Sequence, residues 1–273
     1  MAEFLITFRE VLEAVLIIGI LYSFLNKSDQ NRLIPFIWRG VWSAVALSTV
    51  CSVVFQLVAG GFSGRAEEIF EGVVMILAAV ILSTMIVWMA RNKSVAQDLQ
   101  VKAQKIIDGE KKGGMGIFLL SFLAVFREGA EIILFLYGIA IKQGGLSFVM
   151  SIMGGTIAAS IGYLIFVQSK KVPLKTFFNI SSIVLIFIAG GLIAHGIHEF
   201  EEAGLIPYHG AVWDLNPMVH TDGSFPPLHE KGYIGSIAKG LFGWNGNPSK
   251  TEVFAWTFSI GFIGLLWKKA SQP

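Results

Sequence analysis

The chain has 273 residues, of which 54% are hydrophobic and 15% are charged, and its formal net charge is +2. Soluble domains carry about 25% charged residues, so this composition excludes an ordinary soluble globular protein. The apolar content and the scattered basic residues also exclude a disordered chain and a nucleic-acid-binding protein. The single cysteine, Cys51, leaves no intramolecular disulfide and no thiolate metal cluster. The composition therefore predicts an all-α polytopic membrane protein.

Seven apolar stretches have the length and composition of membrane-spanning helices. They are residues 4–25, 41–59, 69–89, 116–141, 148–167, 177–194 and 253–267. The first has no basic residues before it and is too long for a signal peptide, so we expect a retained helix. The last is short for a hydrocarbon core of ~30 Å. We expect it to begin earlier, to thin the bilayer or to be partly re-entrant.

The distribution of Lys and Arg predicts the orientation of these spans. Fourteen basic residues lie in the first, third and fifth connections and the C-terminal tail, whereas five lie in the other connections. This imbalance predicts that the N-terminus is outside and that the C-terminus is cytoplasmic. The short chain and the lack of external glycosylation acceptors favour a bacterial inner membrane among plasma membranes.

Two connections are long enough to have structure of their own. In residues 91–114, Val95, Leu99 and Ile106 have near-helical spacing, which fits either a helix on the inner membrane surface or a solvated linker. The outer connection, within residues 195–250, holds five of the eight prolines and several aromatic residues. We expect it to form a folded cap over the outer mouth.

An internal repeat relates the two halves of the chain. Residues 4–16 and 122–134 are identical at seven of thirteen positions, including all three charged positions. With three spans in each half, the second copy enters the membrane from the opposite side. The expected organisation of the single permease domain (1–273) is repeat one at about 1–90, a cytoplasmic connector at 91–114, repeat two at about 115–199, an external loop at 200–250 and a last helix at 251–267. Such inverted repeats place the substrate site near the membrane midplane.

Both copies carry the motif Arg-Glu-x-x-Glu within a predicted membrane helix. The residues are Arg9, Glu10 and Glu13 in the first copy, and Arg127, Glu128 and Glu131 in the second. At 100° per residue the three side chains of each motif share one sector of the helix, and the arginine and second glutamate are i,i+4 partners. Six ionised groups at helix centres cost roughly 15–20 kcal/mol before pairing.

Four carboxylates against two guanidiniums leave a surplus of two negative charges, which a bound cation would relieve. Carboxylate oxygens are hard ligands that suit Fe(III), Mn, Mg or Ca. The alternative is two buried ion pairs that only lock the two helices together, but it leaves one carboxylate in each copy without a partner.

Further acidic and imidazole groups lie on the predicted outer side. Glu67, Glu68 and Glu71 stand at the start of the third span, as an acidic entrance or as acids favoured by the helix dipole. All five histidines fall within 35 residues: His195, His198, His209, His220 and His229. The candidate metal contacts in this region are His198, Glu199, Glu201 and Glu202, and the later histidines are weaker candidates. A polar loop without metal contacts is the alternative.

Taken together, these residues resemble the oxidase-dependent iron permease family, which comprises the fungal high-affinity iron permeases and the bacterial EfeU-type permeases. The resemblance rests on Arg-Glu-x-x-Glu in the first and fourth helices and on three further segments, 65–71, 198–204 and 243–249, and it covers essentially the whole chain. It implies that the paired motifs carry iron and that external acidic positions feed it in. It also implies an external partner, a multicopper ferroxidase in fungi or periplasmic Efe-type proteins in bacteria. Iron would be the transported substrate, with no permanent cofactor.

The expected function is therefore inward permeation of iron, with Fe(III) passing between the glutamates of the two motifs while the arginines orient them. Within transport, the alternative is a carrier of another hard divalent cation such as Mn(II). Outside transport, the alternatives are a non-transporting subunit and a membrane-embedded di-iron carboxylate enzyme. Di-iron sites use Glu-x-x-His pairs, and no histidine lies near either motif.

Overall fold

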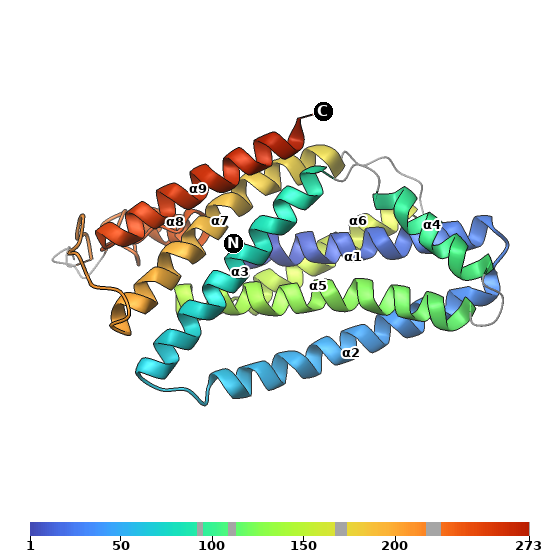
Figure 1. The fold of residues 1–273 in the computed structure, drawn as a ribbon, viewed down its shortest axis with the longest axis horizontal. Coiled ribbons are helices and arrows are strands. Elements are labelled where there is room, and N and C mark those ends of the chain that lie inside the picture. Colours follow the sequence, from blue (N-terminus) through green and yellow to red (C-terminus); the bar gives the residue numbers. More distant parts are fainter. Residues whose placement is uncertain (92–94, 109–112, 167–173, 217–224, 273) are drawn as a thin grey trace.

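The computed structural model describes residues 1–91, 95–108, 113–166, 174–216 and 225–272. In these ranges the chain forms nine α-helices and one short 3-10 turn, and its only β-type pairing is an isolated bridge between Ala211 and Ser249 (Figure 1). The helices are α1 (Ala2–Lys27), α2 (Ile34–Ala59), α3 (Arg65–Arg91), α4 (Val95–Asp108), α5 (Gly113–Gln143), α6 (Phe148–Phe166), α7 (Leu174–Glu202), α8 (Tyr233–Phe242) and α9 (Lys250–Ser271).

The seven long helices coincide with the seven predicted stretches, and the shorter α4 and α8 lie in the two long connections. Four helices, α2, α3, α6 and α7, are long and apolar enough to cross a membrane. Helices α1 and α5 each contain one of the two charged motifs. The full count of seven spans stays a prediction. Of the three expectations for the last span, an earlier start is the one that the structure shows. Helix α9 begins before residue 253 and has 22 residues, a length of about 33 Å.

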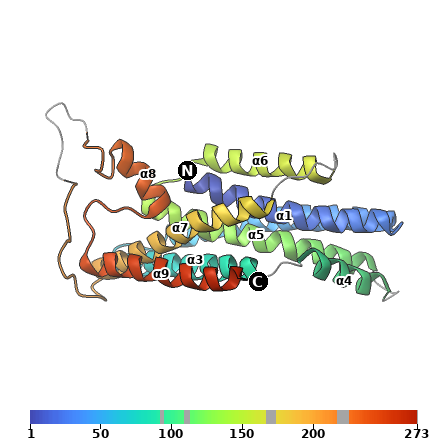
Figure 2. The same ribbon diagram turned by 90° about the horizontal axis from the view of Figure 1, so that it is seen from above.

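The long helices pack in pairs. Helix α1 runs along α6, α2 runs along α5, and α3 runs along α7, while α1 and α5 also contact each other. Helix α9 covers α7 and α3. Figures 1 and 2 show α4 at one end of the bundle and α8 at the opposite end. The motif helices α1 and α5 are therefore flanked by other helices on both sides.

The start of α9 illustrates how the sequence defines a helix end. Ser249 accepts a hydrogen bond from the backbone of Glu252, and the Glu252 carboxylate accepts one from the backbone of Ser249. This capping box satisfies two backbone groups that the first turn would leave without partners. It also fixes the position of the Glu252 side chain.

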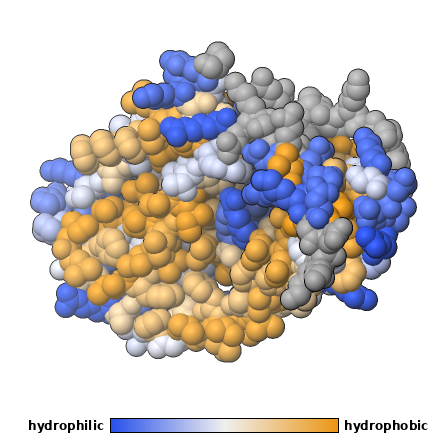
Figure 3. Space-filling view, turned by 45° about the vertical axis from the view of Figure 1, so that its right-hand side comes forward, coloured by the Kyte–Doolittle hydropathy of each residue, from blue (hydrophilic) through white to orange (hydrophobic). Residues whose placement is uncertain are grey.

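The largest apolar core lies between α3, α5, α7 and α9, where side chains such as Leu82, Phe135 and Ile188 are fully or almost fully buried. In contrast, α2 and α6 expose many large apolar side chains, among them Leu57 and Ile152. Figure 3 shows a broad apolar surface on the face that it draws. Such a surface suits contact with lipid acyl chains rather than water.

Two glycines allow the closest helix packing. A Cβ atom on Gly40 of α2 would lie 2.6 Å from the carbonyl oxygen of Phe118 in α5, and one on Gly154 of α6 would lie 2.5 Å from the carbonyl oxygen of Phe4 in α1. Small residues at such positions let helix backbones approach within a membrane.

We expect Gly40→Ala and Gly154→Ala each to destabilise the protein by about 1–3 kcal/mol, because the new methyl group meets backbone that cannot turn away. Gly261→Ala in α9 is the matched control, since nothing lies within 4 Å of a Cβ atom there. Unfolding of the purified protein in mixed detergent micelles measures the loss. Equal stability of Gly154→Ala and Gly261→Ala would contradict the close α1–α6 packing.

Candidate metal centre

The first motif lies on α1 and is almost completely buried. Arg9 and Glu10 are 0% exposed and Glu13 is 8% exposed. The guanidinium of Arg9 lies 3.5 Å from a Glu10 oxygen and 3.3 Å from a Glu13 oxygen, so it contacts both carboxylates. The i,i+4 pair predicted from the spacing is therefore present.

The same guanidinium is held from the other side by α3. Its two terminal nitrogens donate to the sulfur atoms of Met85, at 3.3 Å, and Met89, at 2.8 Å. Thioether sulfur is a weak acceptor, so these contacts orient Arg9 without competing strongly with the carboxylates. Sequence reasoning did not identify either methionine, because their approach depends on how α3 packs beside α1.

The second motif, on α5, has the same three charged residues but a different environment. The Arg127 nitrogen Nε donates to Glu131 at 2.8 Å, again the predicted i,i+4 pair. The side chain of Arg127 is 49% exposed and lies over the Trp88 ring, 5.5 Å from its centroid. Glu128 and Glu131 are only 3% and 8% exposed.

Carboxylates of the two motifs converge between α1 and α5. One oxygen each from Glu10, Glu128 and Glu131 lies within 4.8 Å of the others. Glu13 is outside this group and remains beside Arg9. Both oxygens of Glu10 and one oxygen each of Glu128 and Glu131 are buried with no hydrogen-bond partner among the described residues. Buried carboxylates in this state are costly, and a hard cation between them would satisfy their oxygens.

A groove of about 870 Å³ opens from this carboxylate group. Glu10 and Glu128 line it, and its other walls come from α1, α2, α5 and α6. The groove is mostly apolar, with a few hydroxyl groups such as those of Ser48 and Tyr22. Along α1 it extends from Glu10 to Tyr22, more than three helical turns away. The groove therefore ends against two of the buried carboxylates, Glu10 and Glu128.

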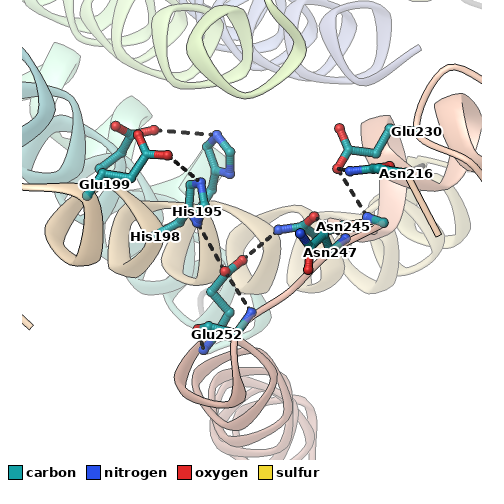
Figure 4. Close-up of polar contacts among 11 residues, drawn as sticks. His195, His198, Glu199, Asn216, Glu230, Asn245, Asn247 and Glu252 are labelled. Carbon is teal, nitrogen blue, oxygen red and sulfur yellow. Dashed lines mark hydrogen bonds and ion pairs between the residues drawn. The ribbon is translucent and has the colours of Figure 1, made fainter. Parts of the chain in front are cut away.

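A second cluster lies at the end of the bundle near α8. Single ligand atoms of His198, Glu201 and Glu252 lie within 4.8 Å of one another. The His198 ring contacts Glu252 at 3.1 Å through Nδ1 and Glu202 at 3.3 Å through Nε2. Both oxygens of Glu201, which is 8% exposed, are buried without a hydrogen-bond partner among the described residues. Figure 4 shows the His198–Glu252 contact.

Sequence reasoning missed Glu252, because it is 54 residues from His198 in the chain. The Ser-x-x-Glu spacing of residues 249–252 identifies Glu252 as a helix-capping residue, but nothing local indicates its contact with the imidazole.

The other outer candidates are placed less closely. Glu199 is buried and lies 3.6 Å from the His195 imidazole. On α3, Glu67 is exposed, and Glu68 and Glu71 are partly buried. A Cβ atom on Gly72 would lie 3.0 Å from the Gly196 carbonyl oxygen, so the start of α3 packs beside the end of α7. None of the three α3 glutamates belongs to either three-residue group.

The later histidines do not join the cluster in the described part of the chain. The two ring nitrogens of His229 contact the carbonyl oxygen of Asn216, at 2.6 Å, and the backbone nitrogen of Lys231, at 3.0 Å, so this ring stabilises the loop. His209 lies 3.5 Å from Thr251. His220 lies outside the described residues.

The unequal burial of the two arginines predicts unequal stability effects. We expect Arg9→Met to lower the free energy of unfolding by about 3–5 kcal/mol, because it leaves two buried carboxylates without their cation. Arg127→Met removes a half-exposed ion pair, which contributes about 0–1 kcal/mol. Unfolding of both variants in iron-free detergent solution gives the comparison. Equal losses would show that the two motifs have equivalent environments.

Comparisons with known proteins identify the family of this chain. The sequence profile described as the Iron permease FTR1 family matches residues 1–272. A protein named "Ferrous iron permease EfeU" from Escherichia coli O6:K15:H31 is 31% identical over 259 residues, which cover 93% of this chain and 90% of that protein. A protein of the same name from Yersinia pestis is 30% identical over 266 residues, or 96% and 89% of the two chains.

An uncharacterised protein from the archaeon Archaeoglobus fulgidus is 32% identical over 247 residues, which cover 90% of this chain and 86% of that protein. No solved structure matches the chain significantly. The profile spans the whole chain from the first motif to α9, and the relatives align over nearly all of it. The chain is therefore a membrane protein that belongs to the FTR1 iron permease family.

Proposed function

We propose that this chain carries iron inward across the membrane and that the motif carboxylates are its ligands. The observation that carries the proposal is the buried group of Glu10, Glu128 and Glu131, in which one oxygen of each carboxylate lies within 4.8 Å of the others. These carboxylates come from two helices, and both oxygens of Glu10 and one oxygen each of Glu128 and Glu131 lack hydrogen-bond partners among the described residues. An all-carboxylate site suits a hard ion such as Fe(III).

The remaining motif residues have supporting roles. Glu13 is a further ligand along α1, and it exchanges its contact with Arg9 for the metal. Arg9 and Arg127 orient the carboxylates and limit their mutual repulsion when no ion is bound. A trivalent ion that moves inward across ~100 mV gains about 7 kcal/mol, which favours inward movement.

The proposed topology is seven spans with an inverted repeat of three helices plus three, followed by α9. The contact pattern supports this repeat, because α1 pairs with α6 as α5 pairs with α2, and α3 pairs with its counterpart α7. In this arrangement the N-terminus is outside, the C-terminus is in the cytoplasm, and the bacterial inner membrane is the favoured location. The segment with α8 forms the external cap, and α4 belongs to the cytoplasmic connector.

In this orientation iron enters near α8 and leaves along the groove. The entrance comprises the outer candidates Glu67, Glu68, Glu71, His198, Glu199, Glu201 and Glu202, now with Glu252. Its support is the grouping of His198, Glu201 and Glu252. The exit follows the groove from Glu10 toward Tyr22, which lies near the cytoplasmic end of α1 in this topology.

The proposed ion is Fe(III), supplied by an external iron-oxidising or iron-delivering protein, whereas the E. coli and Y. pestis relatives are named for ferrous iron. Competition among Fe(II), Fe(III), Mn(II) and Ca(II) for purified protein distinguishes these ions. Preference for Fe(III) supports the proposal, and preference for Mn(II) supports a different hard-cation carrier. We infer a carrier rather than an enzyme, because Glu10, Glu128 and Glu131 form the inner group without the histidines that di-iron enzymes use.

Uptake of radiolabelled iron into liposomes that contain only this protein tests the function. We expect saturable uptake, with losses of at least tenfold for Glu10→Gln, Glu128→Gln and Glu131→Gln, because each removes a charged ligand. Asp98→Asn on α4, an exposed carboxylate that belongs to neither cluster, is the control and should transport normally. Absence of uptake by the natural sequence would favour an enzyme or a non-transporting subunit.

Uptake should also weaken as the external solution becomes acidic. Carboxylate and imidazole ligands must lose their protons to bind a metal, so protons compete with iron at low pH. We expect the initial rate to fall between pH 7.5 and pH 5.5 when free iron is held constant. A flat profile would show that ligand deprotonation does not control entry.

A further inference from the structure

A second cavity, of about 250 Å³, lies near α8, and none of the four motif glutamates lines it. Lys142 at the end of α5, His195 on α7 and Asn247 before α9 contribute to its wall. Figure 4 shows His195 on α7 and Asn247 on the neighbouring segment that leads to α9. The cavity is thus built from three segments that are distant in the sequence.

Lys142 is the unusual member of this wall. This residue is only 5% exposed, and its side chain makes no hydrogen bond or ion pair with any residue that the structure describes. A Cβ atom on Gly191 would lie 2.6 Å from the Lys142 ammonium nitrogen and 2.6 Å from the Gly243 Cα atom. The ammonium group therefore lies against the backbone of Gly191 in α7, where Gly243 at the end of α8 also approaches this helix.

The other lysine that lines the cavity forms an ion pair with a carboxylate. Lys239 donates to Glu230 at 2.8 Å, and Glu230 also accepts bonds from the Asn216 side chain and the Gly246 backbone, each at 3.1 Å. Burial raises the pKa of Glu230, but these hydrogen bonds outweigh burial and lower the pKa to about 2. Glu230 is therefore ionised at neutral pH, and its charge balances that of Lys239.

The second carboxylate that lines the cavity, Glu252, also has hydrogen-bond partners. Glu252 accepts hydrogen bonds from Asn245 at 2.8 Å and from the Ser249 backbone at 3.0 Å, and it contacts His198 at 3.1 Å. Both carboxylates that line the cavity thus have partners, and the buried amine of Lys142 has no counter-charge in the described part of the chain. A buried ammonium group without a counter-charge is strongly unfavourable.

We propose that this cavity binds one small oxyanion, of the carboxylate or carbonate class, with the Lys142 ammonium group as its counter-charge. The side-chain oxygen of Asn247 is buried without a hydrogen-bond partner among the described residues, so this amide has bonding capacity toward the cavity. It can turn its NH₂ group toward the anion. The volume of about 250 Å³ holds one such ion with a few waters.

The cavity shares His198 and Glu252 with the outer metal-competent cluster. An anion beside Lys142 therefore lies next to the proposed entrance and offsets part of the charge of an entering ion. This consequence rests on the proposed function, whereas anion binding itself does not.

Calorimetric titration of metal-free, detergent-solubilised full-length protein tests the proposal. Sodium bicarbonate, acetate and phosphate are added in separate runs at constant sodium concentration and pH. We expect saturable binding of bicarbonate or acetate with one site per chain, and binding of phosphate alone would contradict the assigned anion class. Lys142→Met should weaken the affinity at least tenfold, and Asn247→Ala should weaken it less. Lys231→Met is the matched control, because Lys231 is exposed and lies over the Phe225 ring.

Thermal unfolding provides a second measurement on the same proteins. The binding anion should raise the melting temperature of the natural sequence and of Lys231→Met, but not that of Lys142→Met. Without the anion, Lys142→Met should be at least as stable as the natural sequence, since it removes an unpaired buried charge. The proposal is overturned if neither bicarbonate nor acetate binds, or if Lys142→Met keeps the affinity. Because no metal or transport is involved, these results do not depend on whether the chain carries iron.

Discussion

The structure depends on one electrostatic constraint, the excess of buried carboxylates over buried cations between α1 and α5. Four motif glutamates are almost completely buried, and two arginines lie beside them. In a bilayer, such groups cannot be satisfied by bulk water, and each unpaired charge costs several kcal/mol. The contacts of Arg9 offset only part of this cost. This excess leaves a place for a further positive charge, as the proposed ion site requires, whereas a pair of structural salt bridges would not need one.

The two copies of the motif share their charged residues but differ in their environment. Arg9 is enclosed by α3 and contacts two carboxylates, whereas Arg127 contacts Glu131 and lies half-exposed over Trp88. The packing explains this difference, because α3 passes close enough to Arg9 for Met85 and Met89 to accept from its guanidinium. Glu128 is therefore less constrained by its own arginine than Glu10 is. In the proposed mechanism, Glu128 is the carboxylate that can change its contacts at least cost.

Local spacing in the sequence was enough to predict the seven long helices and the arginine–glutamate pairs, but not α8 in the outer connection. The i,i+4 partners Arg9–Glu13 and Arg127–Glu131 follow directly from helical geometry. Spacing could not determine which carboxylates meet across helices, so it did not separate Glu13 from the three-residue group. The contact of His198 with Glu252 was equally inaccessible, because it depends on α9 packing against α7. Residues joined through tertiary packing leave no periodic signal in one sequence.

The two clusters offer different types of ligand along the proposed path. The outer group offers an imidazole and carboxylates, and it lies beside the partnerless ammonium group of Lys142 in the described structure. The inner group offers carboxylates alone, with the guanidiniums held to one side. Imidazole suits a wider range of transition metals, whereas an all-oxygen site favours hard ions. An ion that moves from the outer to the inner group thus reaches a site that accepts fewer kinds of metal ion. Selectivity for a hard ion is therefore expected to arise at Glu10, Glu128 and Glu131, deep in the bundle, while the outer cluster governs how readily an ion enters.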